Sequence, residues 1–313
     1  MSKSAILKSS IAKKYWMALT GLFLCTFLIG HLLGNLQLIF KVGEEGRRAF
    51  NEYAYFMQHN IFIKVLSYVT YVSILFHAID GLMLAFQNKK ARPQKYAYNN
   101  ANANSSTVSR QMALLGTIIL VFIATHMVNF WAKMHFSEMP LHHVTKTVTI
   151  PTGMDQMSGQ VVTEETDVDY YLTTKGEYIP MQHPIRSIEN LGLLKDAFEE
   201  KSFAEKKETF FYDDKDLKVG EGYKDLHSVV MAFFGQSVEG VETNKLALVA
   251  TILYVLSMLA LSFHLWHGFA SAFQSLGINH KRYTPAIKFI GKAFSVLVPL
   301  AFAIIPVWIY LGL

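Results

Sequence analysis

The chain has 313 residues, of which 51% are hydrophobic and 17% charged, and its formal net charge is +5. Its one cysteine, Cys25, excludes a disulfide bond, a cluster held by several thiolates and covalent haem attachment through a CxxCH motif. Five apolar segments are long enough to cross a bilayer as helices, which takes about 20 residues each; they are 15–40, 61–86, 111–132, 246–273 and 294–313.

These segments predict an all-α membrane protein with five transmembrane helices and one large extracytoplasmic insertion. Residues 1–133 contain helices one to three, residues 134–245 form the insertion, and residues 246–313 contain helices four and five. The N-terminal stretch is basic but has no small-residue cleavage site after its apolar run. We therefore expect an uncleaved first helix rather than a signal peptide.

Positive charge gathers on one side of the predicted bundle. The stretch before helix one, the link between helices two and three and the link between helices four and five contain basic residues but no acid. The positive-inside rule then places the N-terminus in the cytoplasm and the C-terminus outside. The basic faces follow from this topology, and no nucleic acid is needed to explain them. They contain Lys3, Lys8, Lys13 and Lys14; Lys89, Lys90, Arg92, Lys95 and Arg110; and Lys281, Arg282, Lys288 and Lys292.

The segments on the other side differ in length. Residues 47–60 predict a short amphipathic helix at the membrane interface. The insertion is too long for a structureless connection, so we expect a small folded cap. Its alternating runs at 144–150 and 159–172 predict strands, and the runs at 189–207 and 225–235 predict helices. Its histidines fit no zinc pattern and are interpreted as surface or core residues; they are His142, His143, His183 and His227.

Each of the first four transmembrane helices contains one histidine within its apolar run: His31, His77, His126 and His264. A polar ring at membrane depth costs free energy unless it has a partner, so such residues are rare and usually functional. His31 and His126 lie about 16 residues, or ~24 Å, into helices that run outward. His77 and His264 lie past the midpoints of helices that run inward. The sequence therefore predicts an outer pair on helices one and three and an inner pair on helices two and four.

Two imidazoles at one depth on different helices are what six-coordinate haem iron requires of a helical bundle. We predict two haem b groups, the outer one ligated by His31 and His126 and the inner one by His77 and His264. His267, one turn along helix four, is the alternative ligand there.

Two glycines, Gly81 and Gly268, each follow a predicted inner ligand by four residues, where they would let a flat macrocycle approach the helix. The alternative interpretation is that each histidine is a packing residue bonded to a neighbouring helix, which would have to recur in four helices. A chain of proton-translocating histidines would need carboxylates along the bundle, and the sequence offers only Asp80 there.

Four stretches carry a resemblance to a known family: SSIAKKYWMALTGLFLCTFLIGHLLGN, FHAIDGLMLAF, FHLWHGFASAFQSLG and NHKRYTPAIK. They resemble the cytochrome b membrane anchor of bacterial succinate dehydrogenase and fumarate reductase, of the five-helix type with two haems in one polypeptide. The resemblance covers all five helices, about two thirds of the chain, and leaves the insertion uncovered.

The resemblance implies a respiratory-chain protein of the bacterial inner membrane, linked to the tricarboxylic acid cycle. It implies the same histidine pairing, with the first and third helices holding the distal haem and the second and fourth the proximal one. It further implies a quinone, as a rule menaquinone, near the distal haem, and soluble flavoprotein (FAD) and iron–sulfur subunits on the cytoplasmic face. Dicarboxylate chemistry would take place on another subunit, so we predict no catalytic residue for it in this chain.

A quinone site needs a proton acceptor near the outer haem. Glu52 follows helix one on the predicted interfacial helix, beside the aromatic side chains Tyr53 and Phe56, and the resembled family has a carboxylate at about this point. A solvated surface charge is an equal alternative for Glu52, and His59 is the next residue to consider.

Other function classes stay open. Within electron transfer the alternative is the cytochrome b anchor of a hydrogenase or formate dehydrogenase. Outside it, the chain would be a non-redox multi-pass protein, such as a transporter or assembly factor, with structural histidines.

Overall fold

Five long helices form the body of the molecule in a computed structural model that describes residues 10–91, 106–154, 160–180, 205–207, 210–212 and 218–313. Each helix is long and apolar enough to cross a membrane, which confirms a multi-pass membrane protein with five transmembrane helices. The spans are Ile11–Phe40, Ile61–Lys90, Met112–Phe136, Ala247–Ser275 and Thr284–Leu311.

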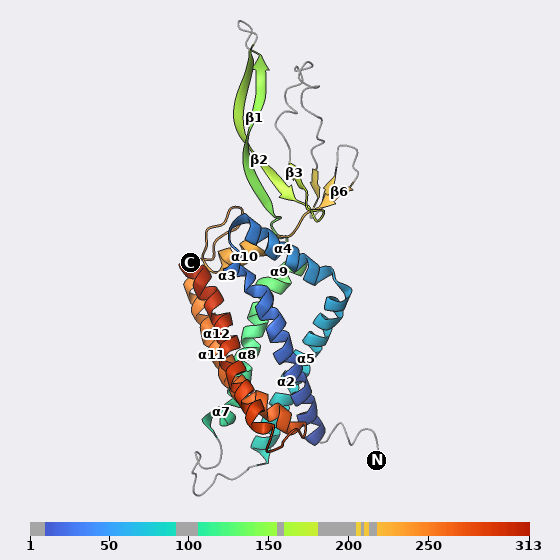
Figure 1. Ribbon diagram of the computed structural model, residues 1–313, viewed down its shortest axis with the longest axis vertical. Helices are drawn as coiled ribbons and strands as arrows, with labels where there is room; N and C mark the ends of the chain where they lie inside the picture. The colour runs from blue at the N-terminus through green and yellow to red at the C-terminus, as the bar shows by residue number, and fades with distance from the viewer. Residues whose placement is uncertain (1–9, 92–105, 155–159, 181–204, 208–209, 213–217) are drawn as a thin grey trace.

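The spans are built from the helices labelled in Figure 1. Span one is α2 (Ser10–Asn35) continued by α3 (Gln37–Phe40), and span two is α5 (Ile61–Lys90). Span three joins α8 (Met112–His126), a π-helical turn η1 (Met127–Ala132) and α9 (Lys133–Phe136). Spans four and five are α11 (Ala247–Ser275) and α12 (Thr284–Leu311). The short α7 (Thr107–Arg110) precedes α8.

Several spans extend beyond their apolar cores. Span five is predicted from residue 294 but begins at Thr284, because Pro285 is favourable in a first helical turn and the helix continues through Lys288 and Lys292. Span two likewise runs on to Lys90. Lysines at helix ends can keep their charged heads in water while their stems cover apolar surface. Hydropathy therefore identified the membrane-crossing part and underestimated the helix length.

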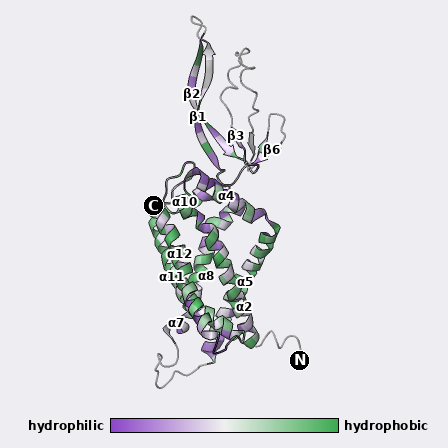
Figure 2. Cartoon of the chain, in the orientation of Figure 1, coloured by the Kyte–Doolittle hydropathy of each residue, from purple (hydrophilic) through white to green (hydrophobic). Residues whose placement is uncertain are grey.

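The two ends of the bundle differ in what they contain. The N-terminal end of α2, the end of α5, α7 and the link between α11 and α12 lie at one end, and the C-terminus and the insertion lie at the other (Figure 1). The green apolar colouring of Figure 2 follows the long helices between these ends. The described basic residues of the acid-free segments thus share one end of the bundle, whereas Lys3, Lys8, Arg92 and Lys95 lie outside the described residues.

The insertion contains two small antiparallel sheets and one helix within its described residues. Strands β1 (His143–Met154) and β2 (Val161–Leu172) form a long ribbon that projects from the bundle (Figure 1), and β3 (Tyr178–Pro180) joins its base. The second sheet contains β4 (Glu205–Lys207), β5 (Phe210–Tyr212) and β6 (Lys218–Glu221), and α10 (Leu226–Phe233) follows it.

Most of the strands and helices predicted within the insertion are confirmed. Both alternating runs form strands, in a register that pairs Val148 with Thr166, and the run at 225–235 contains α10. The prediction of a helix over 189–207 is wrong at its last three residues, which form strand β4 by pairing with β5. The remainder of that run, and His183, lie outside the described residues.

The predicted interfacial helix is present as α4 (Gly43–His59), and it connects the bundle to the insertion. Its Phe50 is buried in an apolar cluster with Leu38 of α3, Val230 of α10 and Ile305 and Ile309 of α12. Asn60 then caps α5 by accepting hydrogen bonds from two backbone N–H groups of its first turn. Helix α4 is therefore held by an apolar cluster at Phe50 and by the capped junction at its C-terminal end.

A polar cluster around the buried side chains of Asn51, His142 and Asp225 joins α4 to the insertion. The Arg47 guanidinium donates to Asp225 Oδ2 from Nε at 2.9 Å and from Nη2 at 2.6 Å. Asn51 donates to Asp225 Oδ1 at 2.7 Å and to His142 Nδ1 at 3.1 Å, and His142 Nε2 contacts Glu44. Because Asn51 occupies Nδ1, it is Nε2 that carries the His142 proton. We call Glu44, Arg47, Asn51, His142 and Asp225 the α4 clamp.

The charges of the clamp stabilise one another. Burial by itself disfavours the Asp225 carboxylate, but the hydrogen bonds and charge of Arg47, with Ser228 and Asn51, hold the pKa of Asp225 below its ordinary value. Asp225 also caps α10 by accepting from the Ser228 N–H at 3.1 Å. The clamp therefore sets the position of α10 as well as that of the sheets.

We predict that Asp225→Asn loosens α10, because the amide leaves the Arg47 guanidinium without its buried countercharge. Breaking such a pair costs about 3–5 kcal/mol, and this loss is expected in the opening free energy of α10 measured by hydrogen exchange. The matched control is Glu52→Gln at the exposed Arg48–Glu52 pair, where the loss is about 1 kcal/mol or less. Equal losses in the two variants would contradict the importance of the clamp.

Candidate haem-binding histidine pairs

The structure brings together the two rings of the predicted outer pair. His31 of α2 and His126 at the end of α8 have ring centroids 5.8 Å apart, with the ring planes at 86°. A metal–imidazole nitrogen bond is about 2 Å long, which puts the centroids of two axial imidazoles about 6 Å apart. The observed separation fits one iron between the two rings.

Aromatic side chains surround the outer pair. Phe27 stacks on His31 at 5.4 Å, and Phe302 of α12 lies 5.6 Å from the same ring. Phe122 and Phe130, one turn before and one turn after His126, lie 5.7 Å and 5.3 Å from it. Such rings provide an apolar, flat-sided environment, which suits a porphyrin better than it suits a free polar ligand.

The predicted inner pair is also brought together. The rings of His77 in α5 and His264 in α11 lie 6.1 Å apart at 68°. Gly21 of α2 faces this pair, because a Cβ added there would lie 3.1 Å from His77 Cε1, and one added at Gly116 of α8 would lie 3.7 Å from His264 Cε1. The two glycines that face the rings of the predicted inner pair thus belong to α2 and α8.

The glycines singled out from the sequence have looser surroundings. A Cβ at Gly81 would meet only the sulfur of Met17, and one at Gly268 only the terminal methyl of Met112, each at 4.0 Å. Space beside these two helices remains consistent with the approach of a macrocycle.

The hydrogen bonds of His77 engage Nδ1 and leave Nε2 as the nitrogen that could bind a metal. His77 Nδ1 lies 3.1 Å from the Met17 carbonyl oxygen and 3.3 Å from Thr20 Oγ1, whose own proton is directed to the Trp16 carbonyl. A carbonyl only accepts, so Nδ1 carries the proton and Nε2 keeps its lone pair. Metal-bound histidines commonly have this arrangement, with the second nitrogen donating to a carbonyl or carboxylate.

The other rings have fewer partners. His126 Nδ1 lies 3.4 Å from the Tyr254 hydroxyl, and His31 Nδ1 lies 3.5 Å from Asn35 Nδ2. His264 Nδ1 is buried with no hydrogen-bond partner among the described residues. An unpaired buried nitrogen is costly in a protein interior, and it is therefore notable that one occurs within a predicted ligand pair.

The alternative ligand His267 lies one turn along α11 from His264 and is partly buried. Among the ring contacts of the described residues, His264 faces His77 and His267 has no histidine opposite it. The geometry thus favours the pairing predicted from depth, and the assignment of these histidines as ligands stays a prediction. Asp80 is partly buried one turn from His77.

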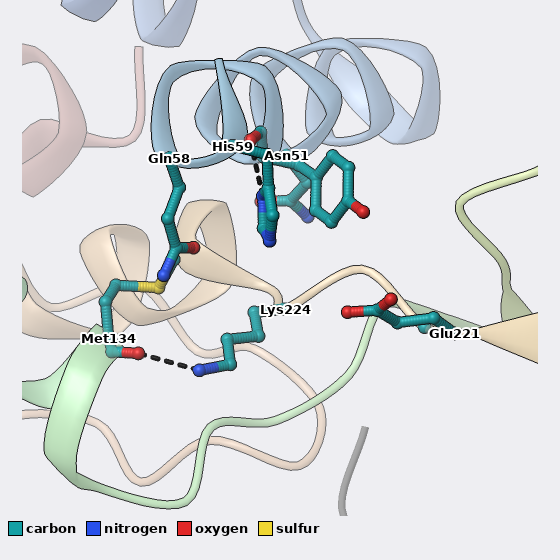
Figure 3. A pocket seen from close by; sticks show the side chains of 8 residues that line it. Asn51, Gln58, His59, Met134, Glu221 and Lys224 are labelled. Carbon is teal, nitrogen blue, oxygen red and sulfur yellow. Dashed lines mark hydrogen bonds between the residues drawn. The ribbon is translucent and has the colours of Figure 1, made fainter. Parts of the chain in front are cut away.

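A polar pocket of about 200 Å³ lies beside the α4 clamp, between α4, the end of span three and the insertion. Figure 3 shows the His59 ring directed from α4 toward Lys224 and Glu221. His59 Nδ1 lies 2.9 Å from the Tyr55 carbonyl, so Nδ1 carries the proton and Nε2 is an acceptor. Lys224 Nζ donates to the Met134 carbonyl at 2.7 Å. Asn51, Tyr55, Gln58 and Gly222 complete the lining.

Of the two predicted quinone residues, only His59 lines this pocket. Glu52 instead accepts a hydrogen bond from Arg48 Nε at 2.7 Å, and both side chains are 39% exposed. Tyr55 stacks on His59 with ring centroids 3.9 Å apart. Burial, with the nearby Glu221 charge, raises the pKa of the Tyr55 hydroxyl, which stays a proton donor.

Several contacting residues were not identified from the sequence. Met17 and Thr20 of α2 contact the His77 ring through a backbone carbonyl and a hydroxyl. Nothing in their type or spacing distinguishes them from packing residues. No histidine lies within one helical turn of Tyr254 in α11. Its contact with His126 arises only when α8 and α11 pack together. The clamp residues Arg47, Asn51 and Asp225 are separated by up to 178 positions along the chain.

Within the described residues no group of three or more histidine, cysteine, aspartate or glutamate side chains could hold a metal ion. The groups of the bundle that could bind a metal-containing cofactor are the two histidine pairs, one at each level. Comparison with known proteins finds no matching family model, no matching curated protein and no matching solved structure.

Proposed function

We propose that this chain is a membrane anchor that conducts electrons between a quinone and a soluble iron–sulfur subunit through two non-covalently bound b haems. The observation that carries the proposal is the meeting of four intramembrane histidines as two pairs, at 5.8 Å and 6.1 Å, on four different helices. Polar rings at membrane depth are expensive, and two such pairs at two levels have a natural use as axial ligands.

The residues present fit two haems. His31 and His126 would hold the outer one and His77 and His264 the inner one, with ring separations suited to one iron each. When bound, the haems supply reversible one-electron transfer across the bundle. The chain's own contribution is to hold the ring nitrogens in place: the Met17 carbonyl orients His77, and Tyr254 contacts His126.

A quinone site near the outer pair is the second part of the proposal. The pocket beside α4 contains an acceptor, His59 Nε2, and a cation, Lys224, and it belongs to the same end of the bundle as the outer pair. His59 would take a proton from a quinol hydroxyl and pass it to water. Glu52, engaged by Arg48, is the alternative acceptor, and menaquinone is the quinone implied by the family resemblance.

The basic end of the bundle is the proposed docking site for the soluble subunits. Flavoprotein and iron–sulfur subunits of a succinate dehydrogenase or fumarate reductase would dock at the basic end of the bundle, beside the inner pair. In the bacterial inner membrane this end would face the cytoplasm, with the N-terminus there and the C-terminus and insertion outside. The anchor then counts as an enzyme subunit only as part of that complex.

The first prediction of the proposal concerns the ligands. Replacing any one of the four paired histidines by alanine removes one low-spin b-type signal from the optical and electron paramagnetic resonance spectra and leaves the other. On helix four, His264→Ala removes the inner signal and the matched variant His267→Ala keeps it. The reverse result would make His267 the ligand.

The second prediction concerns the quinone. His59→Gln lowers quinol-linked turnover of the complex by about 100-fold or more, because the general base is lost, while both haem signals and dye-linked activity of the soluble subunits remain. Glu52→Gln is the comparison variant at an exposed position of the same helix. If Glu52→Gln removes turnover and His59→Gln does not, the proton acceptor is Glu52.

The third prediction concerns docking. Crosslinkers placed at Lys89 or Lys281 capture the iron–sulfur subunit, and crosslinkers placed on the β1–β2 ribbon do not. Capture at the ribbon instead would reverse the proposed topology. Co-purification of hydrogenase or formate dehydrogenase subunits in place of a flavoprotein would assign the anchor to that other class of complex.

A further inference from the structure

Tyr254 connects the outer histidine pair to the insertion. It lies in α11, the helix that supplies His264 to the inner pair, yet its hydroxyl lies 3.4 Å from Nδ1 of His126. The Asn129 side chain of the π-helical turn also interacts with this hydroxyl. Helix α11 therefore acts on both levels of the bundle.

The Tyr254 ring is held in an aromatic cage. Phe122 of α8 contacts it edge-on at 4.9 Å, and Phe233 and Phe234 lie 5.9 Å and 5.0 Å from it. Phe233 belongs to α10 of the insertion and also contacts Phe130 at 5.1 Å. Contacts of this kind, with centroids 4.5–7 Å apart, are the favoured aromatic geometries.

The cage depends on the α4 clamp. Asp225 caps α10 and is itself held by Arg47, so the clamp fixes the helix that carries Phe233. Phe234 is 3% exposed and belongs to the same buried cluster as Phe50 of α4. A continuous series of contacts thus runs from the clamp through α10 and Tyr254 to His126.

We infer that Tyr254 is a positioning residue for His126, and that the insertion serves to hold it there. The inference rests on the proposed function. If His126 binds iron through Nε2, its Nδ1 must carry a proton and donate it to the Tyr254 oxygen. An acceptor on the second nitrogen makes an imidazole a more basic ligand. A more basic ligand stabilises the oxidised metal and lowers the reduction potential of the outer haem.

The test is Tyr254→Phe, which keeps the ring and its cage and removes only the oxygen. The expected result is a purified protein that retains both haems, with a higher midpoint potential and altered low-spin paramagnetic resonance g values for the outer haem alone. The matched control is Tyr71→Phe, whose ring contacts among the described residues are Tyr68 and Trp131; it leaves both haems unchanged. An unchanged outer haem in Tyr254→Phe overturns the inference.

Two further variants test the hydrogen bond of Tyr254 and the role of the insertion separately. If Tyr254→Phe loses the outer haem, Tyr254→Gln, which restores an acceptor oxygen, must recover it; failure to do so overturns the hydrogen-bonding role. Asp225→Asn must shift the outer potential in the same direction and leave the inner one alone. If hydrogen exchange shows α10 loosened while the outer potential stays constant, the role of the insertion is refuted.

Failure of the inference and failure of the proposed function are distinguishable. A wild-type protein that binds no haem refutes the proposed function, and the Tyr254 experiment then has no signal to measure. A wild-type protein with two haems and an insensitive Tyr254→Phe variant refutes only the positioning role.

Discussion

The cost of placing a polar ring in a membrane is the constraint on which the bundle depends. Each of the four histidines needs a partner at its own depth, and a side chain on another helix can supply it. The structure meets this requirement by pairing α2 with α8 and α5 with α11. The backbone carbonyl of Met17 then contacts Nδ1 of His77, and the hydroxyl of Tyr254 contacts Nδ1 of His126. The bundle thus contains two levels of paired imidazoles.

The end of the bundle that contains the insertion has a different organisation. In the α4 clamp the buried Asp225 carboxylate is paired with the partly buried Arg47 guanidinium, and buried charges cost stability unless every group is paired. Here they join segments that lie far apart in the chain and fix α10 against the outer pair. The insertion thereby becomes part of the outer site's surroundings, and its ribbon projects away from them (Figure 1).

Sequence reasoning predicted what depends on local composition and on depth. Apolar length identified five spans, and the rise of an α-helix was enough to place His31 opposite His126 and His77 opposite His264. It could not find contacts made by unremarkable residue types between distant segments. Gly21 against His77, Tyr254 against His126 and Asp225 against Arg47 arise from tertiary packing alone. Glu52 was favoured for its neighbours in sequence, but its local partner Arg48 and the position of the pocket place His59 nearer to the proposed chemistry.

The most direct test of the central claim is a reduced-minus-oxidised spectrum of the purified, unmodified protein, combined with a haem-to-protein ratio. The account predicts two low-spin, non-covalent b haems per chain, each with two histidine ligands. A purified, folded protein that shows no b-type absorbance after expression with sufficient haem would contradict it and would leave the paired histidines with a structural role.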